Sequence, residues 1–121
     1  MEDKIIIYLA SPYSDPDPHV RVQRYYSAME CTAALLNRGA IVYSPIVHFH
    51  ELAIRHSLPT DAAWWQRQNE GMLSLVEALY VLAIPDWKTS LGVQAEIKWA
   101  FNNGKKLTIV NVKGIPAGEK V

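Results

Sequence analysis

Four short runs of apolar residues occur along the chain, and each is rich in β-branched and aliphatic side chains. Continuous apolar runs of this kind, without strict alternation, are typical of strands buried on both faces of a parallel sheet. Proline follows or closes each of the first three runs, which indicates where the strands end. The predicted strands are residues 4–10, 40–45, 78–84 and 106–112.

The segments between these runs carry apolar residues three and four positions apart, which is the spacing of one helix face. The first predicted helix begins at Pro18 behind an Asp17 cap. It ends near Arg38, with Gly39 as its C-terminal glycine. Its expected buried face consists of Tyr25, Ala28, Thr32, Leu35 and Leu36.

Two further helices are predicted in the second half of the chain. One starts at Thr60 or Asp61 and passes through Trp64, Met72, Leu73 and Val76. The other lies within residues 89–106, is capped by Ser90 and is closed by Gly104. Residues 46–60 are expected to form an irregular loop with a short helix, and the tail from residue 113 is expected to be a loop that frays.

Strand and helix alternate throughout, which predicts one α/β domain over residues 1–121 with a parallel sheet and helices on both of its faces. Ligands of such sheets bind beyond the carboxyl ends of the strands. The candidate site residues are therefore sought after Ala10, Tyr43, Ile84 and Val112.

The composition narrows the range of partners. Twelve basic residues balance twelve acidic ones, which argues against broad electrostatic binding to nucleic acid or to an anionic membrane. The single cysteine, Cys31, suits a reducing compartment. The apolar run near the N-terminus is too short for a membrane span and lacks the cleavage region of a signal peptide, so we expect a cytoplasmic protein.

Polar side chains follow the first two predicted strands. Ser11, Tyr13 and Ser14 offer hydroxyls to a polar ligand, or they only build a turn. His48 and His50 alternate in the second segment and would face the same way on an extended chain, as zinc ligands do. Their ligand set is incomplete, so a loop histidine that bonds a base or packs on a tryptophan is favoured over a metal site.

The third strand leads into the most informative pattern. Ser90 can cap the following helix, and Gly92 allows a ligand to approach the first turn, where unpaired amides and the helix dipole favour an anion. Glu96 lies one turn deeper on the same face. A phosphate at the helix start and a carboxylate below C1′ would fit the two ends of a nucleotide sugar. The alternative is an exposed Glu96 paired with Lys88 or Lys98.

Four segments together resemble the nucleoside 2-deoxyribosyltransferase-like superfamily. They are IYLASPYS, SPIVHFH, WWQRQNEGMLSLVEALYVLAIPDW and TSLGVQAEIKWA. In their order and spacing they are most similar to the DUF1937 family, and the SLGVxxE motif is also similar to that of the 2′-deoxynucleoside 5′-phosphate N-hydrolases. The resemblance implies a flavodoxin-like, Rossmann-type sheet of four to five strands.

The resemblance also implies an activity, which is cleavage or transfer at an N-glycosidic bond with Glu96 as the nucleophile. It implies that Ser90 and Gly92 contact the 5′ substituent, and that Tyr8, Ser11 and Tyr13, with Pro12 between them, line the sugar and base pocket. No metal or organic cofactor is implied, and a homodimer or larger homo-oligomer is expected. His48 and Trp65 are further candidates for contact with the base; Trp64, Trp65 and Phe49 can stack on it or pack in the core or in a dimer interface.

One position departs from the family pattern, since Asn69 stands where relatives have an aspartate that holds the sugar or assists proton transfer. Asparagine can bond a hydroxyl, but it cannot act as a base. The leading hypothesis is an N-glycosidase that acts on a nucleoside or its 5′-monophosphate, with hydrolysis of a monophosphate preferred over base exchange. A non-catalytic module that binds or senses a nucleotide is the main alternative, and a structural subunit without a site is a third.

Overall fold

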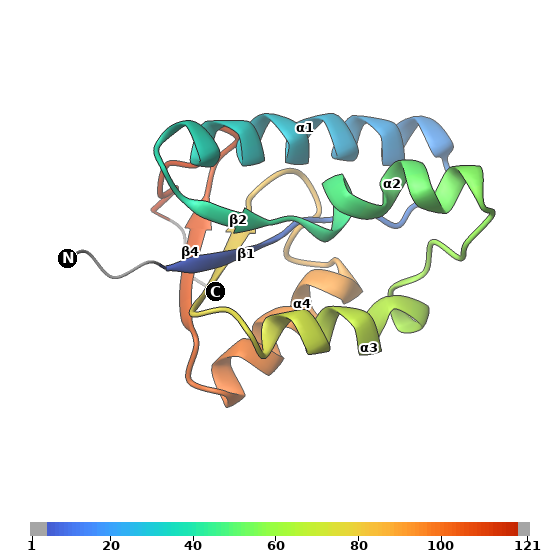
Figure 1. Ribbon diagram of the computed structural model, residues 1–121. Helices are drawn as coiled ribbons and strands as arrows, with labels where there is room; N and C mark the ends of the chain where they lie inside the picture. The colour runs from blue at the N-terminus through green and yellow to red at the C-terminus, as the bar shows by residue number, and fades with distance from the viewer. Residues whose placement is uncertain (1–4, 119–121) are drawn as a thin grey trace.

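The computed structural model describes residues 5–118 and shows one four-stranded parallel sheet (Figure 1). The strands are β1 (Ile6–Ala10), β2 (Ile41–Tyr43), β3 (Ala78–Leu82) and β4 (Lys106–Val110). All four predicted strands are confirmed, each within its predicted run, and the sheet order is β2-β1-β3-β4. The predicted start at Lys4 lies outside the described residues.

Helices cover both faces of the sheet, as the alternation predicted. They are α1 (Pro18–Asn37), α2 (Pro45–Arg55), α3 (Ala62–Leu73) and α4 (Leu91–Asn102). Figure 1 shows α1 on one face and α3 with α4 on the other, while α2 lies beside α1 and extends past the strand ends. None of the helices within residues 5–118 is long and apolar enough to cross a membrane.

The predicted caps of three helices are confirmed. The side chains of Asp17, Asp61 and Ser90 accept hydrogen bonds from first-turn amides of α1, α3 and α4. Such bonds satisfy donors that the helix itself leaves unpaired, and they fix where each helix begins. Gly39 and Gly104 follow the ends of α1 and α4 with φ of 87° and 69°, a backbone conformation that favours glycine.

The segment after β2 was predicted as an irregular loop with a short helix, and the structure shows that the helix takes up most of it, over residues 45–55. Pro45 does stop the strand, but it also occupies the first turn of α2, where its missing amide costs nothing. Ser44 caps this helix by accepting from the Val47 amide at 3.3 Å. An extended arrangement of His48 and His50 is therefore wrong, and the two rings point in different directions around a helix.

Two smaller expectations about buried faces were wrong. Leu36 is 52% exposed, and Cys31 instead lies in the core with Leu35. Helix α3 ends at Leu73, so Val76 is buried in the loop that leads to β3 rather than on the helix.

Alternate residues of β1 enter two separate cores, one on each face of the sheet. Tyr8 and Ala10 pack in the cluster beneath α3 and α4, whereas Leu9 packs in the cluster beneath α1. This burial on both faces explains why the strand reads as an unbroken apolar run. Tyr8 is therefore held in the core directly below α4.

The sheet order creates a crevice at one place. The chain leaves β1 toward β2 on one side and later returns to β3 on the other side, so β1 and β3 are neighbours whose connections diverge. Ligands of open α/β sheets bind at such switch points. The loops after Ala10 and Leu82 flank this crevice.

The described part of the tail folds back against β4. Asn111 N donates to Ile115 O and Ala117 N donates to Ile109 O, both at 2.9 Å. A frayed tail is therefore wrong for residues 113–117, and residues 119–121 lie outside the described part of the chain.

Gly114 in this tail is expected to be intolerant of substitution. It is buried with a φ of 71°, and a Cβ there would lie 2.8 Å from both Leu35 Cδ2 and Arg38 Nη1. Gly114→Ala combines backbone strain with overpacking, and we expect it to lower the free energy of unfolding by about 2–4 kcal/mol. The matched control is Gly104→Ala, which has a φ of 69° and open space, and should cost only about 1–2 kcal/mol. Equal urea midpoints for the two variants would contradict this packing.

Candidate functional site

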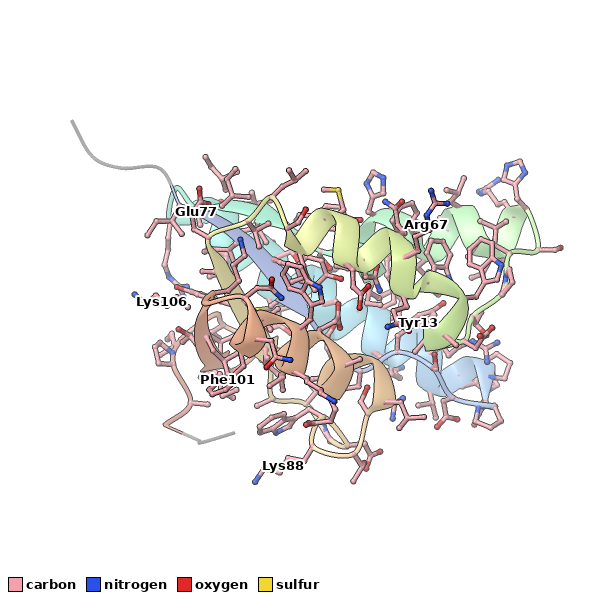
Figure 2. All side chains as sticks on the ribbon, turned by 90° about the horizontal axis from the view of Figure 1, so that it is seen from below. Tyr13, Arg67, Glu77, Lys88, Phe101 and Lys106 are labelled. Carbon is pink, nitrogen blue, oxygen red and sulfur yellow. The ribbon has the colours of Figure 1, made fainter. Side chains whose placement is uncertain are left out.

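A cavity of about 480 Å³ opens at the carboxyl ends of β1 and β3. Its walls come from the loop after β1, from α2, from the start of α3 and from the β3–α4 connection. In Figure 2, Tyr13, which lines the cavity, lies at the opposite end of the molecule from Glu77 and Lys106, which mark the starts of β3 and β4. A cavity therefore lies at the end of the sheet where the strand order predicted a binding site.

The resemblance assigns ten residues to the site, if His48 and Trp65 are counted as contacts to the base, and seven of the ten line this cavity. They are Ser11, Tyr13, Trp65, Asn69, Ser90, Gly92 and Glu96. Tyr8 and Pro12 are fully buried and are not among the lining residues, while His48 lies on the exposed side of α2 against Tyr43 and Phe49. The structure thus does not bring His48 to the cavity.

Glu96 is the buried acid of the site. It lies on α4 one turn after Gly92, and its side chain is 9% exposed. Burial raises the pKa of Glu96 to about 7, and the nearby Tyr8 hydroxyl offsets part of that rise. The alternative of an exposed glutamate paired with a lysine is therefore wrong.

The hydroxyl of Tyr8 faces Glu96 from the sheet below. Burial, followed by the charge of Glu96, raises the pKa of Tyr8 well above its usual value, so the phenol stays protonated. The hydroxyl is close enough to influence the carboxyl, but it does not reach the distance and alignment of a hydrogen bond. We therefore treat it as a neighbour that can bond Glu96 after a small movement.

Two further buried polar atoms at the cavity lack partners among the described residues, the Ser11 Oγ and the Asn69 Oδ1. A buried polar atom without a hydrogen bond is costly and uncommon in folded proteins. Both residues line the same cavity as Glu96, so a polar ligand placed there would supply the missing partners.

The start of α4 forms another wall. Ser90 Oγ accepts from Val93 N at 3.3 Å, and Gln94 N bonds Ser90 O at 2.9 Å. The amides of Leu91 and Gly92 have no carbonyl one turn earlier to bond, and they lie at the positive end of the helix dipole. On its other side, the Cβ position of Gly92 faces Ala62 at 3.4 Å, so the glycine also permits close packing of α4 against α3.

Glu96, Asn69 and Gly92 also line a second hollow of about 310 Å³ between α3 and α4. Glu96 therefore borders both hollows.

An aromatic wall faces the cavity from α2 and α3. The rings of Phe49 and Trp65 lie 4.8 Å apart, and Trp65 Nε1 donates to Pro59 O at 2.7 Å, which fixes the indole. Both residues line the cavity, whereas Trp64 is 52% exposed and does not. This wall offers a flat apolar surface of the kind on which a base stacks.

His50 also lines the cavity. This position was not predicted from the sequence, because an extended chain was considered at this segment. Its Nδ1 lies 2.7 Å from the Tyr13 hydroxyl, and its ring stacks on Tyr25 at 4.0 Å. Burial lowers the pKa of His50 below its usual value. The sequence does carry a pattern that predicts this position of His50. One helix face contains Ile46, Phe49, His50 and Ala53, which are three and four residues apart, and all four line the cavity.

Arg24 on α1 joins the two loops that flank the crevice. Its guanidinium bonds Asp86 Oδ2 at 3.2 Å and Ser14 O at 2.9 Å, and its side chain is 12% exposed. Ser14 Oγ in turn donates to Thr60 O at 2.5 Å, so the loop after β1 is tied to the α2–α3 connection. No sequence signal marked Arg24, since its partners are distant in the chain.

Within residues 5–118, no group of three or more His, Cys, Asp or Glu side chains is arranged to hold a metal ion.

A family model described as a domain of unknown function, DUF1937, matches residues 5–112. Among curated proteins, none matches the chain significantly.

Proposed function

The chain belongs to the DUF1937 family, and we propose that it cleaves the N-glycosidic bond of a nucleoside or a nucleoside 5′-monophosphate. The observation that carries this proposal is Glu96, a buried carboxyl group in the wall of a cavity whose neighbouring wall is a helix N-terminus. The sequence likeness to the nucleoside 2-deoxyribosyltransferase-like superfamily supports the same chemistry.

The spacing of the site suits a ribose or deoxyribose. The first turn of α4 offers amides to the 5′ substituent, while Glu96 lies one turn further along the same helix, beneath C1′. The aromatic wall of Phe49 and Trp65 lies within the same cavity and accepts the base. Ser11 and Asn69 supply unpaired polar atoms to the sugar hydroxyls.

The proposed reaction follows the double-displacement route of retaining glycosidases. An ionised Glu96 oxygen bonds to C1′ while the bond from C1′ to the base nitrogen breaks, and the electron pair leaves with the base. Water then attacks C1′ of the glycosyl ester, the glutamate oxygen leaves, and the free sugar is released. A second base that enters in place of water would give base transfer.

The charge of the cavity bears on whether the substrate carries a phosphate. Three carboxylates line it besides Glu96, at Asp15, Asp61 and Asp86, and its one lining arginine, Arg24, is already paired with Asp86. The helix start favours an anion, but these acids oppose one. We therefore propose unphosphorylated nucleosides and nucleoside 5′-monophosphates equally as substrates.

A non-catalytic module that binds a nucleotide is the second candidate, and Asn69 is the observation that favours it. Its Oδ1 is buried and unpaired at the cavity, so it can bond a ligand hydroxyl, yet an amide cannot transfer a proton as a carboxylate does. A module of this kind would bind the same ligands and leave the glycosidic bond intact.

One experiment separates the two functions. The purified chain is incubated with ribo- and deoxyribonucleosides and with their 5′-monophosphates, and free base is measured by chromatography. We expect release from at least one substrate. Thermal stabilisation by a substrate that stays intact would support the binding module instead, because a ligand that binds only the folded state raises the melting temperature. If the panel shows neither release of base nor thermal stabilisation, both proposed functions are contradicted.

A further inference from the structure

We propose that His50 is the acid that protonates the departing base, with Tyr13 holding its ring in position. This inference rests on the proposed N-glycosidase function and assigns a role that Asn69 cannot fill. It names a side chain on α2, across the cavity from the helix that carries Glu96.

The position of His50 supports this role. Its ring lines the cavity although the residue is only 6% exposed, and it belongs to the same wall as Phe49, against which the base is expected to stack. Nδ1 is engaged by the Tyr13 hydroxyl at 2.7 Å. That contact leaves Nε2 as the ring nitrogen available to a ligand.

The ring is held from two sides. Tyr25 stacks on one face at 4.0 Å with an interplanar angle of 18°, and Tyr13 meets its edge at 85°. An imidazole fixed in this way loses little freedom when it meets a substrate. Such fixation is characteristic of a group that transfers a proton at one defined atom.

The other acids of the cavity are less suited to proton donation. Asp61 caps α3 through Trp64 N at 3.1 Å, and Asp86 is 70% exposed and paired with Arg24. Asp15 accepts from Asp17 N at 2.8 Å. Each carboxylate is thus already engaged in a hydrogen bond or ion pair. The imidazole of His50, in contrast, can carry a proton at either ring nitrogen and can give it up.

The proton can be followed through both steps. Protonated His50 gives the Nε2 proton to the base nitrogen as the C1′–N bond breaks, and becomes neutral while Glu96 becomes the ester. Neutral His50 then takes a proton from the water that attacks C1′. Glu96 leaves as a carboxylate, and the imidazolium is restored with no other reactant needed.

The groups that face His50 determine its pKa, and therefore the pH range in which it can donate a proton to the base. Burial lowers the pKa of His50, the charge of Arg21 on α1 lowers it further, and the charge of Glu51 on its own helix raises it. The Tyr13 hydroxyl and the Tyr25 ring contact the imidazole directly. Activity needs an ionised Glu96 and a protonated His50 together. We therefore expect a bell-shaped dependence of kcat/KM on pH, whose two limbs belong to the pair.

The test compares two substrates that share one sugar. The first is whichever nucleoside releases base in the substrate panel, and the second is the 4-nitrophenyl glycoside of its sugar, which departs as a phenolate without a proton. For the nucleoside, His50→Gln should lower kcat/KM by about 10²- to 10⁴-fold. For the nitrophenyl glycoside it should change little. The matched control is His48→Gln, on the exposed side of the same helix, which should leave both rates unchanged.

The pH dependence of kcat/KM of the wild-type chain tests the same role without requiring that any variant folds. Its alkaline limb should be present with the nucleoside and absent with the nitrophenyl glycoside, because only the former needs the proton. Equal losses on both substrates in a folded His50→Gln variant, or the same alkaline limb with both substrates in the wild type, would overturn the role of His50. Absence of nucleoside cleavage by the wild type would instead overturn the proposed function itself.

Discussion

Glu96→Gln is expected to reduce base release by on the order of 10⁴-fold, because it removes the nucleophile while keeping the shape of the side chain. An amide oxygen cannot form the glycosyl ester that the carboxylate forms. The variant should still bind substrate, since the cavity walls and the start of α4 are untouched. The loss should therefore appear in kcat rather than in thermal stabilisation by the substrate.

The matched control for this loss is Glu51→Gln. Glu51 lies on α2, next in sequence to His50, but its side chain is 63% exposed and bonds Arg55 at 2.8 Å, outside the cavity. Its substitution removes one carboxylate close to the site and leaves the cavity walls in place, so its effect on base release should be limited to a shift of the pH profile, because Glu51 raises the pKa of His50. Base release that survives Glu96→Gln, or that falls equally in both variants, would remove Glu96 from the role of nucleophile.

The fold could be predicted from sequence because its signals are local. Each strand is a short apolar run, and caps such as Asp17, Asp61 and Ser90 mark helix starts through bonds to residues only two or three positions away. Alternation of strand and helix then leaves few topologies, since crossovers between parallel strands are right-handed. Helix α2 was the exception, because Pro45 serves both as a strand stop and as a helix start.

The site was only partly predictable, because several of its contacts join residues that are far apart in the sequence. Ser90, Gly92 and Glu96 lie on one helix, so their spacing alone places them together. The pairing of Tyr13 with His50 spans 37 residues, and that of Arg24 with Asp86 spans 62. Such pairs depend on how α1 and α2 pack beside the sheet, which no local pattern specifies.

A buried acid of this kind carries a cost in stability, and Glu96→Gln should reveal it. The pKa of Glu96 is raised from 4.5 to about 7 by burial, so the folded chain holds a proton that the unfolded chain has already lost at intermediate pH. The free energy of unfolding must then fall as the pH rises from the unfolded value through the folded one. A shift of this size corresponds to about 3 kcal/mol once the pH exceeds both values.

Glutamine has no charge to bury, so Glu96→Gln should match the wild type near about pH 4 and exceed it by up to about 3 kcal/mol near about pH 8. Urea unfolding at several pH values measures the difference as a change in midpoint at constant slope. Glu51→Gln should behave oppositely, because Arg55 lowers the pKa of Glu51 and the substitution removes a contact that favours folding at neutral pH. A gap between Glu96→Gln and the wild type that does not change with pH would mean that this carboxyl is solvated in the folded chain. A gap that widens with pH, found in a variant that has lost base release, would show that stability is sacrificed at this position for an ionisable group in the cavity wall.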